Sequence, residues 1–244
     1  MIGATMRKIF FLVTFAALAS LLCFAGRKQD DRMKLVDSGS FGIFHDNQRI
    51  ATETFRIEQN AIHSVTTSEV KSADSTNATQ QSELELAANG DLIKYTWRQV
   101  KPEHQEFELV PQEQTLVQHY GTGDGKKTSD LPYLLPSSTS VLDDYFFIQR
   151  ELLAWKYIAT QCPDLTKCKL IAEEMGVVVP HDHNSEAVQL AYKGQQTLTL
   201  KGSSVSLRQF ILTEDHTDWA LYFDDSQKLV MLAIPSDGLE VVRD

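Results

Sequence analysis

Two histidines form the pattern in this chain that comes nearest to a metal site. The stretch PHDHN, Pro180 to Asn184, places His181 and His183 two residues apart. On a β-strand, side chains at that spacing point to the same face, where two imidazoles are a common beginning of a zinc or copper site. The sequence offers no third ligand at a characteristic spacing. The alternative is a polar turn between two strands, and we expect that turn, with no metal and no cofactor.

Two cysteines form the second candidate pattern. The stretch CPDLTKC contains Cys162 and Cys168, and the remaining cysteine of the chain, Cys23, lies near the N-terminus. The spacing is not CxxC and no second cysteine pair is present, which argues against a zinc or redox-catalytic motif. In an oxidising compartment, two close cysteines favour a disulfide, and closing so short a loop stabilises a fold by about 2–3 kcal/mol. We therefore predict a structural disulfide between Cys162 and Cys168.

The sequence lacks the common signatures of catalysis. No G-x-S-x-G is present, so the nucleophile elbow of the α/β hydrolases is not indicated. The glycine-rich stretch GTGDGKK, Gly121 to Lys127, lacks the G-x-x-x-x-G-K-[ST] spacing of a phosphate loop. Carboxylate pairs have local explanations: Asp143 and Asp144 stand at an expected helix start, and Asp224 and Asp225 in an expected turn. We therefore predict that this protein is not an enzyme.

Aromatic side chains are the remaining candidates for a binding site. Most aromatic residues of a β-rich protein simply fill its core, and that is the alternative interpretation here. If a cavity is present, its wall is expected to come from sheet residues that face the helix. The candidate ligand-binding residues are Tyr95, Trp97, Phe147 and Trp155.

The N-terminus has the pattern of an export signal. Arg7 and Lys8 precede an uncharged apolar run that is shorter than the roughly 20 residues a membrane-spanning helix needs. Cys23 and Ala25 suit the small-residue positions of a cleavage site, so we predict a signal peptide over residues 1–25 and a periplasmic or secreted protein. Two alternatives stay open: the segment is retained as a membrane anchor, or Cys23 is lipidated. Membrane contact is expected only through this segment.

The charge of the chain narrows the choice of partners. The whole chain carries 23 basic and 33 acidic residues, a formal charge of −10. Removal of Arg7 and Lys8 with the signal peptide leaves 21 basic against 33 acidic residues, a formal charge of −12. An acidic surface repels phosphate backbones, so nucleic acid is not an expected partner.

Most of the mature chain is expected to be β-structure. After a charged linker over residues 26–38, residues 39–244 are predicted to form a single β-rich domain of about eleven strands. Asp46–Asn47 and Asn89–Gly90 have the residue types of tight hairpin turns, and turns are also expected at Lys193–Gly194 and Lys201–Gly202. Such closely spaced turns are typical of antiparallel meanders.

One segment departs from this pattern. Apolar residues recur at positions 141, 145, 148, 152, 155 and 159, the spacing of a helix, which predicts a long helix over about residues 140–161. Ser140 is the candidate N-cap, and Pro163 ends the helix. Because its apolar residues lie on several sides, the helix is expected to be buried on most sides. The predicted fold is α+β and mainly antiparallel β: a curved sheet or half-barrel packed on this helix, with a closed β-barrel as the alternative.

Two stretches carry a resemblance to a known superfamily. The opening hairpin FGIFHDNQRIATETFRIE, Phe41 to Glu58, and the closing strands of Asp218 to Asp244 resemble the periplasmic lipoprotein-carrier (LolA/LolB-like) half-barrels and their uncharacterised exported relatives. The resemblance is one of pattern over much of the mature chain. It implies an antiparallel half-barrel that cups helices, with an apolar cavity for acyl chains. The chain departs from the carriers in having one clear helix, so a lid of several helices is not implied.

Two functional hypotheses follow from these observations. The first is an exported, non-catalytic binding module for an apolar ligand, such as lipid or an acylated envelope component. The alternative is a structural or interaction protein of the cell envelope, because the edges of a sheet can accept a strand from a partner protein. The sequence does not determine the oligomeric state.

Overall fold

The computed structural model describes residues 31–74, 76–122, 127–162, 164 and 172–244. The chain divides into two compact units, Met1–Asp31 and Arg32–Asp244, and the fold described here is that of the second. The predicted signal peptide, Cys23 and Cys168 lie outside the described residues. Among the residues described, no helix is both long and apolar enough to cross a membrane.

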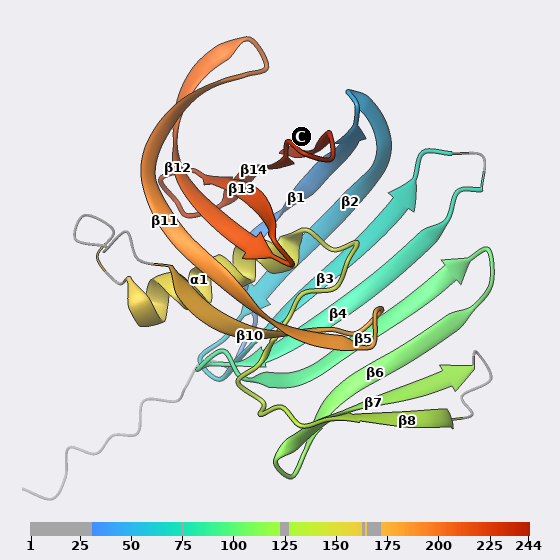
Figure 1. Cartoon of the computed structure of the whole chain (residues 1–244). Coiled ribbons are helices and arrows are strands. Elements are labelled where there is room, and N and C mark those ends of the chain that lie inside the picture. The colour runs from blue at the N-terminus through green and yellow to red at the C-terminus, as the bar shows by residue number, and fades with distance from the viewer. Residues whose placement is uncertain (1–30, 75, 123–126, 163, 165–171) are drawn as a thin grey trace, which may run out of the picture. The chain divides into compact units, whose positions relative to one another are not determined.

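The described residues form fifteen strands and one helix (Figure 1). The elements are β1 (Lys34–His45), β2 (Gln48–Gln59), β3 (His63–Ser72), β4 (Thr79–Ala87), β5 (Leu92–Lys101), β6 (Gln105–Gln112), β7 (Thr115–Thr122), β8 (Lys127–Tyr133), β9 (Ser140–Val141), α1 (Ile148–Gln161), β10 (Glu173–Val179), β11 (Asn184–Leu200), β12 (Ser203–Glu214), β13 (Thr217–Phe223), β14 (Leu229–Ile234) and β15 (Leu239–Arg243). β1 therefore begins inside the stretch 26–38 that was predicted to be a linker.

All fifteen strands belong to one sheet. Its order is β8-β7-β6-β5-β4-β3-β2-β1-β15-β14-β13-β12-β11-β10-β9, and the first and last strands of the described chain pair at its middle. Neighbours are antiparallel except β9 and β10, which are parallel. The sheet curls around α1 (Figure 1) but does not close, because β8 and β9 remain its edges. The mainly antiparallel class is confirmed, and the closed-barrel alternative is wrong.

The helix is shorter than the predicted segment 140–161. Ser140 and Val141 pair with β10 instead, and the Leu142 amide donates to the Val178 carbonyl at 3.0 Å. α1 begins only at Ile148, with Phe147 rather than Ser140 at the N-cap position. Residues 143–147 form a turn, in which the Phe146 amide donates to the Asp143 carbonyl, and Tyr145 is exposed. Pairing with β10 satisfies the backbone groups of residues 140–142, so this part of the segment does not need helical hydrogen bonds.

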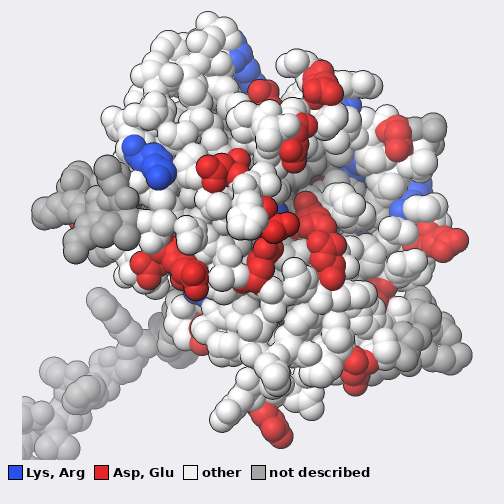
Figure 2. Space-filling view, viewed as in Figure 1, with Lys and Arg blue, Asp and Glu red and all other residues white. Residues whose placement is uncertain are grey.

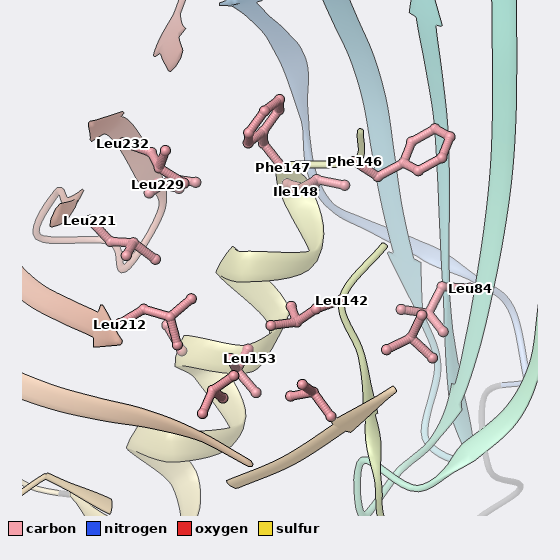
Figure 3. Packing of buried hydrophobic residues seen from close by; sticks show 14 of the residues in the cluster. Leu84, Leu142, Phe146, Phe147, Ile148, Leu153, Leu212, Leu221, Leu229 and Leu232 are labelled. Atoms are coloured by element: carbon pink, nitrogen blue, oxygen red, sulfur yellow. The ribbon is translucent and has the colours of Figure 1, made fainter. Parts of the chain in front are cut away.

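The core surrounds α1 on both sides. Figure 3 shows Leu84 of β4 on one side of the helix and leucines of β12 to β14 on the other. Burying a leucine side chain stabilises a fold by about 1.5–3 kcal/mol, so the helix is firmly held between these layers. The fully or almost fully buried members drawn there include Leu142, Phe146, Ile148, Leu153, Leu212, Leu221, Leu229 and Leu232.

Acidic groups predominate over basic groups on the face of the molecule shown in Figure 2. This agrees with the formal charge of −10. A negatively charged surface repels anionic polymers. In a protein with this excess of carboxylates, a buried or half-buried cation that contacts no carboxylate is unusual.

Candidate functional site

A groove of about 250 Å³ lies between α1 and the inner face of β2, β3 and β4, with β9 along one side. Its walls are largely apolar, and its polar groups come mainly from the helix and from the Asn89–Gly90 turn. The apolar wall residues include Ile57, Leu84, Leu86, Val141, Leu152 and Leu153.

The helix presents one continuous stripe to this groove. Gln149, Leu152, Leu153, Lys156 and Thr160 follow the three-and-four spacing that places side chains on one face of a helix. Gln149 is 2% exposed, whereas Lys156 is half-buried and Thr160 is exposed. The stripe therefore runs from a deep end at Gln149 to an open end beyond Lys156.

Gln149 lies at the deep end of the groove. Its Oε1 accepts a hydrogen bond from the Asp143 backbone amide, which fixes the orientation of the side-chain amide. Its Nε2 is fully enclosed, and the same amide lies beside the Tyr95 hydroxyl, where it limits the rise in the pKa of that group. Because this nitrogen has no accessible surface, Gln149 closes the deep end of the groove.

Lys156 places a positive charge near the open end. Its Nζ donates to the Ser138 carbonyl, and it lies 3.5 Å from the Gly90 carbonyl and 3.4 Å from the Ser140 hydroxyl. These three partners are neutral oxygens. Burial lowers the pKa of Lys156, and Asp91 acts in the opposite direction. The ammonium is thus held in place without a carboxylate in contact with it.

A buried carboxylate from the sheet fixes the start of α1. Glu53 of β2 accepts hydrogen bonds from the amides of Phe147 at 2.8 Å and Ile148 at 3.4 Å, and from the Ser68 hydroxyl at 2.7 Å. These amides are among the first N–H groups of the helix, which have no acceptor within the helix itself. Burial raises the pKa of Glu53 to about 7, and these hydrogen bonds limit the rise.

A second buried carboxylate, Glu151, lies in the first turn of α1 itself and holds it to β14 and β15. Glu151 accepts the Leu229 amide at 2.7 Å and the Arg243 guanidinium at 3.0 Å. Arg243 also donates to Asp37 at 2.8 Å, and Lys228 lies 2.7 Å from that same carboxylate. Burial raises the pKa of Glu151 to about 8. Burial acts to raise the pKa of Asp37 too, but the two cations lower it below its ordinary value.

A third polar cluster lies beside the start of the helix, around Asp143. Its buried carboxylate contacts the Tyr95 hydroxyl and Nδ1 of His181. The His181 ring packs edge-on against Trp97, with ring centroids 4.4 Å apart. Burial and the Asp143 charge raise the pKa of Tyr95 well above its ordinary value. These contacts tie β5 to the turn after β10, and Nε2 of His181 is enclosed without a hydrogen-bond partner.

The four aromatic candidates do not share one site. Trp155 lines the groove and donates its indole N–H to the Gln227 carbonyl at 2.6 Å. Tyr95 and Trp97 belong to the Asp143–His181 cluster. Phe147 is buried at the start of α1, with the Arg150 guanidinium 5.6 Å from its ring centroid.

The two histidines lie in a turn. The His183 amide donates to the Pro180 carbonyl at 3.2 Å, and His183 has a positive φ of 54°. The His183 ring packs against Tyr120, while His181 contacts Asp143. Within the described ranges, no group of three or more His, Cys, Asp or Glu side chains is arranged to hold a metal ion.

Cys162 directly follows α1 and is 1% exposed. Because Cys168 lies outside the described residues, the pairing of these two cysteines stays a prediction.

Gln149 and Lys156 were not among the site residues predicted from the sequence. Both lie in the segment whose apolar residues were used to predict a helix, and they are polar positions seven residues apart on one face. That spacing is a usable signal, but only the structure shows that this face borders a groove rather than water.

Comparison with known proteins gives a similar fold and no family. No family model and no curated protein matches the chain. The structure is similar to the crystal structure of a β-barrel-like protein of the domain of unknown function DUF1849 from Brucella abortus, with a TM-score of 0.52 and 10% sequence identity. The similarity covers 85% of this chain and 94% of that chain. It supports the barrel-like fold alone, and the resemblance to the lipoprotein carriers stays a prediction.

Proposed function

We propose that this protein is an exported, non-catalytic binding module for a small molecule with an apolar chain, and that the groove beside α1 is its site. The observation that carries the proposal is the groove itself, which has mostly apolar walls and runs from buried Gln149 to exposed Thr160. Its volume of about 250 Å³ approaches the range of roughly 300–1,000 Å³ that is usual for small-molecule sites.

The groove has a preformed wall. Glu53 accepts hydrogen bonds from amides at the start of α1, and Glu151 in the first turn contacts Leu229 and Arg243. A helix held at these points keeps its groove-facing stripe in place without a ligand. Preorganisation of this kind reduces the entropy that binding must offset.

The proposed location rests on the N-terminal sequence. Cleavage after Ala25 would release the protein into the periplasm or the medium, and retention or lipidation at Cys23 would hold it at the membrane. An oxidising compartment would also allow Cys162 and Cys168 to form a disulfide. The resemblance to lipoprotein carriers favours a ligand from the cell envelope.

A second candidate function is interaction with an envelope protein through the sheet edge. β8 is an edge strand, and Leu134, directly after it, is 91% exposed. An added strand could pair with β8, as in other complexes that extend a sheet. Crosslinking in cells, with and without Leu134→Asp, tests this function separately from ligand binding.

Native mass spectrometry of the mature protein tests the main proposal. We expect an added mass that disappears after extraction with organic solvent. Ala159→Trp places a large side chain at the open end of the groove and should remove the added mass. Ala187→Trp is the matched control, because Ala187 is exposed on β11, away from the groove. A bare wild-type protein that also fails to bind added fatty acid or alcohol would contradict the proposal.

A further inference from the structure

We infer that the ligand of this groove is a single-chain anionic amphiphile whose charged head group binds Lys156 and whose chain lies along α1 toward Gln149. This inference rests on the proposed function and adds the charge, orientation and polarity of the ligand. The proposed occupant of the groove is therefore a small molecule and not a segment of protein.

The charge of the head group follows from the surroundings of Lys156. Its ammonium is half-buried, its contacts are two backbone carbonyls and one hydroxyl, and it forms no ion pair with any described residue. Asp91 acts on Lys156 through its charge without an ion pair, and its carboxylate accepts a hydrogen bond from the Asn89 side chain at 2.9 Å. Charges removed from water are stable when they are paired, so an anion at the open end supplies what Lys156 lacks.

The net negative charge of the protein favours a small anion over a large polyanion at Lys156. The chain has a formal charge of −10, and most of its cations that approach α1 meet carboxylates, as Arg243 meets Glu151 and Asp37. Lys156 is therefore a local exception in an acidic molecule. An anion that reaches the groove is held there by one contact, while the surrounding surface disfavours large polyanions.

The length and polarity of the chain follow from the helix. Seven residues separate Gln149 from Lys156, which corresponds to about 10.5 Å along a helix axis. Leucines line the space between them, so methylene groups suit this stretch. Gln149 closes the deep end, and its enclosed Nε2 has no surface open to the groove, so the chain ends against apolar walls.

Binding titrations with chains of equal length test the head group. The mature protein is titrated with decanoate, decanol and decylamine by calorimetry, after extraction of any bound molecule. We expect decanoate to bind about tenfold more tightly than decanol, the effect of one charge-assisted hydrogen bond, and decylamine to bind most weakly. From hexanoate to decanoate, affinity should increase by about fourfold per methylene until the groove is filled.

Two variants of Lys156 distinguish the contribution of the head group to affinity from that of the chain. Lys156→Met keeps an unbranched side chain and removes the charge, so decanoate and decanol should then bind within about twofold of each other, while decanol affinity is unchanged. Lys156→Arg should keep the preference for decanoate, which also guards against a folding defect in the first variant. Lys193→Met is the matched control, because Lys193 is exposed on β11.

The outcomes distinguish the two proposals. Equal binding of decanoate and decanol to the wild-type protein would overturn the inference about the head group and leave the proposed function standing. Failure of all the ligands to bind would overturn both. A native mass spectrum in which the groove is filled by a peptide rather than an extractable amphiphile would also overturn the inference.

Discussion

On the side of α1 that faces β14 and β15, a buried carboxylate meets an opposite charge, whereas on the side that borders the groove a cation does not. Glu151 contacts Arg243 and the Leu229 amide, and Arg243 reaches Asp37. Lys156 contacts only neutral oxygens. The first side therefore contributes ion pairs to stability, while the second holds a cation that no carboxylate contacts, as a site for an anion does.

The largest expected effect is on the charge-paired side. Arg243→Met leaves Glu151 and Asp37 buried with one cation fewer, and it also removes contacts with the rings of Phe41 and Phe55. Removing one partner of a buried pair typically costs about 3–5 kcal/mol. Urea denaturation followed by fluorescence should show a loss of that size in the free energy of unfolding.

A surface pair is the control for this variant. Arg56 and Glu58 form an exposed ion pair at 2.6 Å, so Arg56→Met should lower the free energy of unfolding far less than Arg243→Met does. Equal losses in the two variants would mean that burial does not distinguish the Arg243 cluster, and the comparison between the two sides of α1 would lose its basis.

An intermediate effect is expected from pH, through the carboxylate that fixes the start of the helix. Burial raises the pKa of Glu53 from 4.5 to about 7, so between these values the folded state binds more protons than the unfolded state. Its contribution to stability is therefore fully present below pH 4.5, falls as pH rises to about 7, and then levels off. Glu151 acts in the same direction up to about pH 8, whereas the lowered pKa of Asp37 matters only in more acidic solution.

Glu53→Gln tests this pH dependence. Glutamine keeps an oxygen that can accept the Phe147 amide but does not ionise, so the variant should lose less stability between pH 4.5 and 7 than the wild-type protein. The expected difference in slope corresponds to on the order of 3 kcal/mol across that window. Glu58→Gln, at an exposed position, should leave the wild-type slope unchanged. Parallel curves for the wild-type protein and Glu53→Gln would contradict the role assigned to Glu53.

The turns of the fold were predictable because their signals are local. Asp46, Asn47 and Gly90 have positive φ values of 50°, 64° and 82°, and the residue types at these positions tolerate such values. The turn predicted at Lys193–Gly194 was wrong: this dipeptide is a bulge inside the 17-residue strand β11, between two paired segments. Glycine serves both a turn and a bulge, and only the pairing with β12 distinguishes them.

The helix start and the site depended on contacts distant in sequence. Residues 140–147 carry a helical spacing, but pairing with β10 keeps Ser140 and Val141 extended. The carboxylate that fixes the start of α1 comes from Glu53, which lies 94 residues before Phe147 in the chain. No local pattern reveals such a partner. The choice of aromatic residues as ligand-binding candidates likewise did not locate the groove, because Trp97 and Phe147 fill other parts of the core.

The smallest expected effect is on the unpaired side, and it is the most informative. Lys156→Met removes an ammonium that is partly withdrawn from water without a carboxylate in contact with it. The lost hydrogen bonds and the relieved desolvation oppose each other, so stability without ligand should change by less than about 1 kcal/mol. Added decanoate should stabilise the wild-type protein as its concentration exceeds the dissociation constant, and should stabilise the variant much less. Thermal melts with and without decanoate measure both effects. A large loss of stability in the ligand-free variant would mean that Lys156, like Arg243, holds the fold together, and the two sides of α1 would no longer differ in kind.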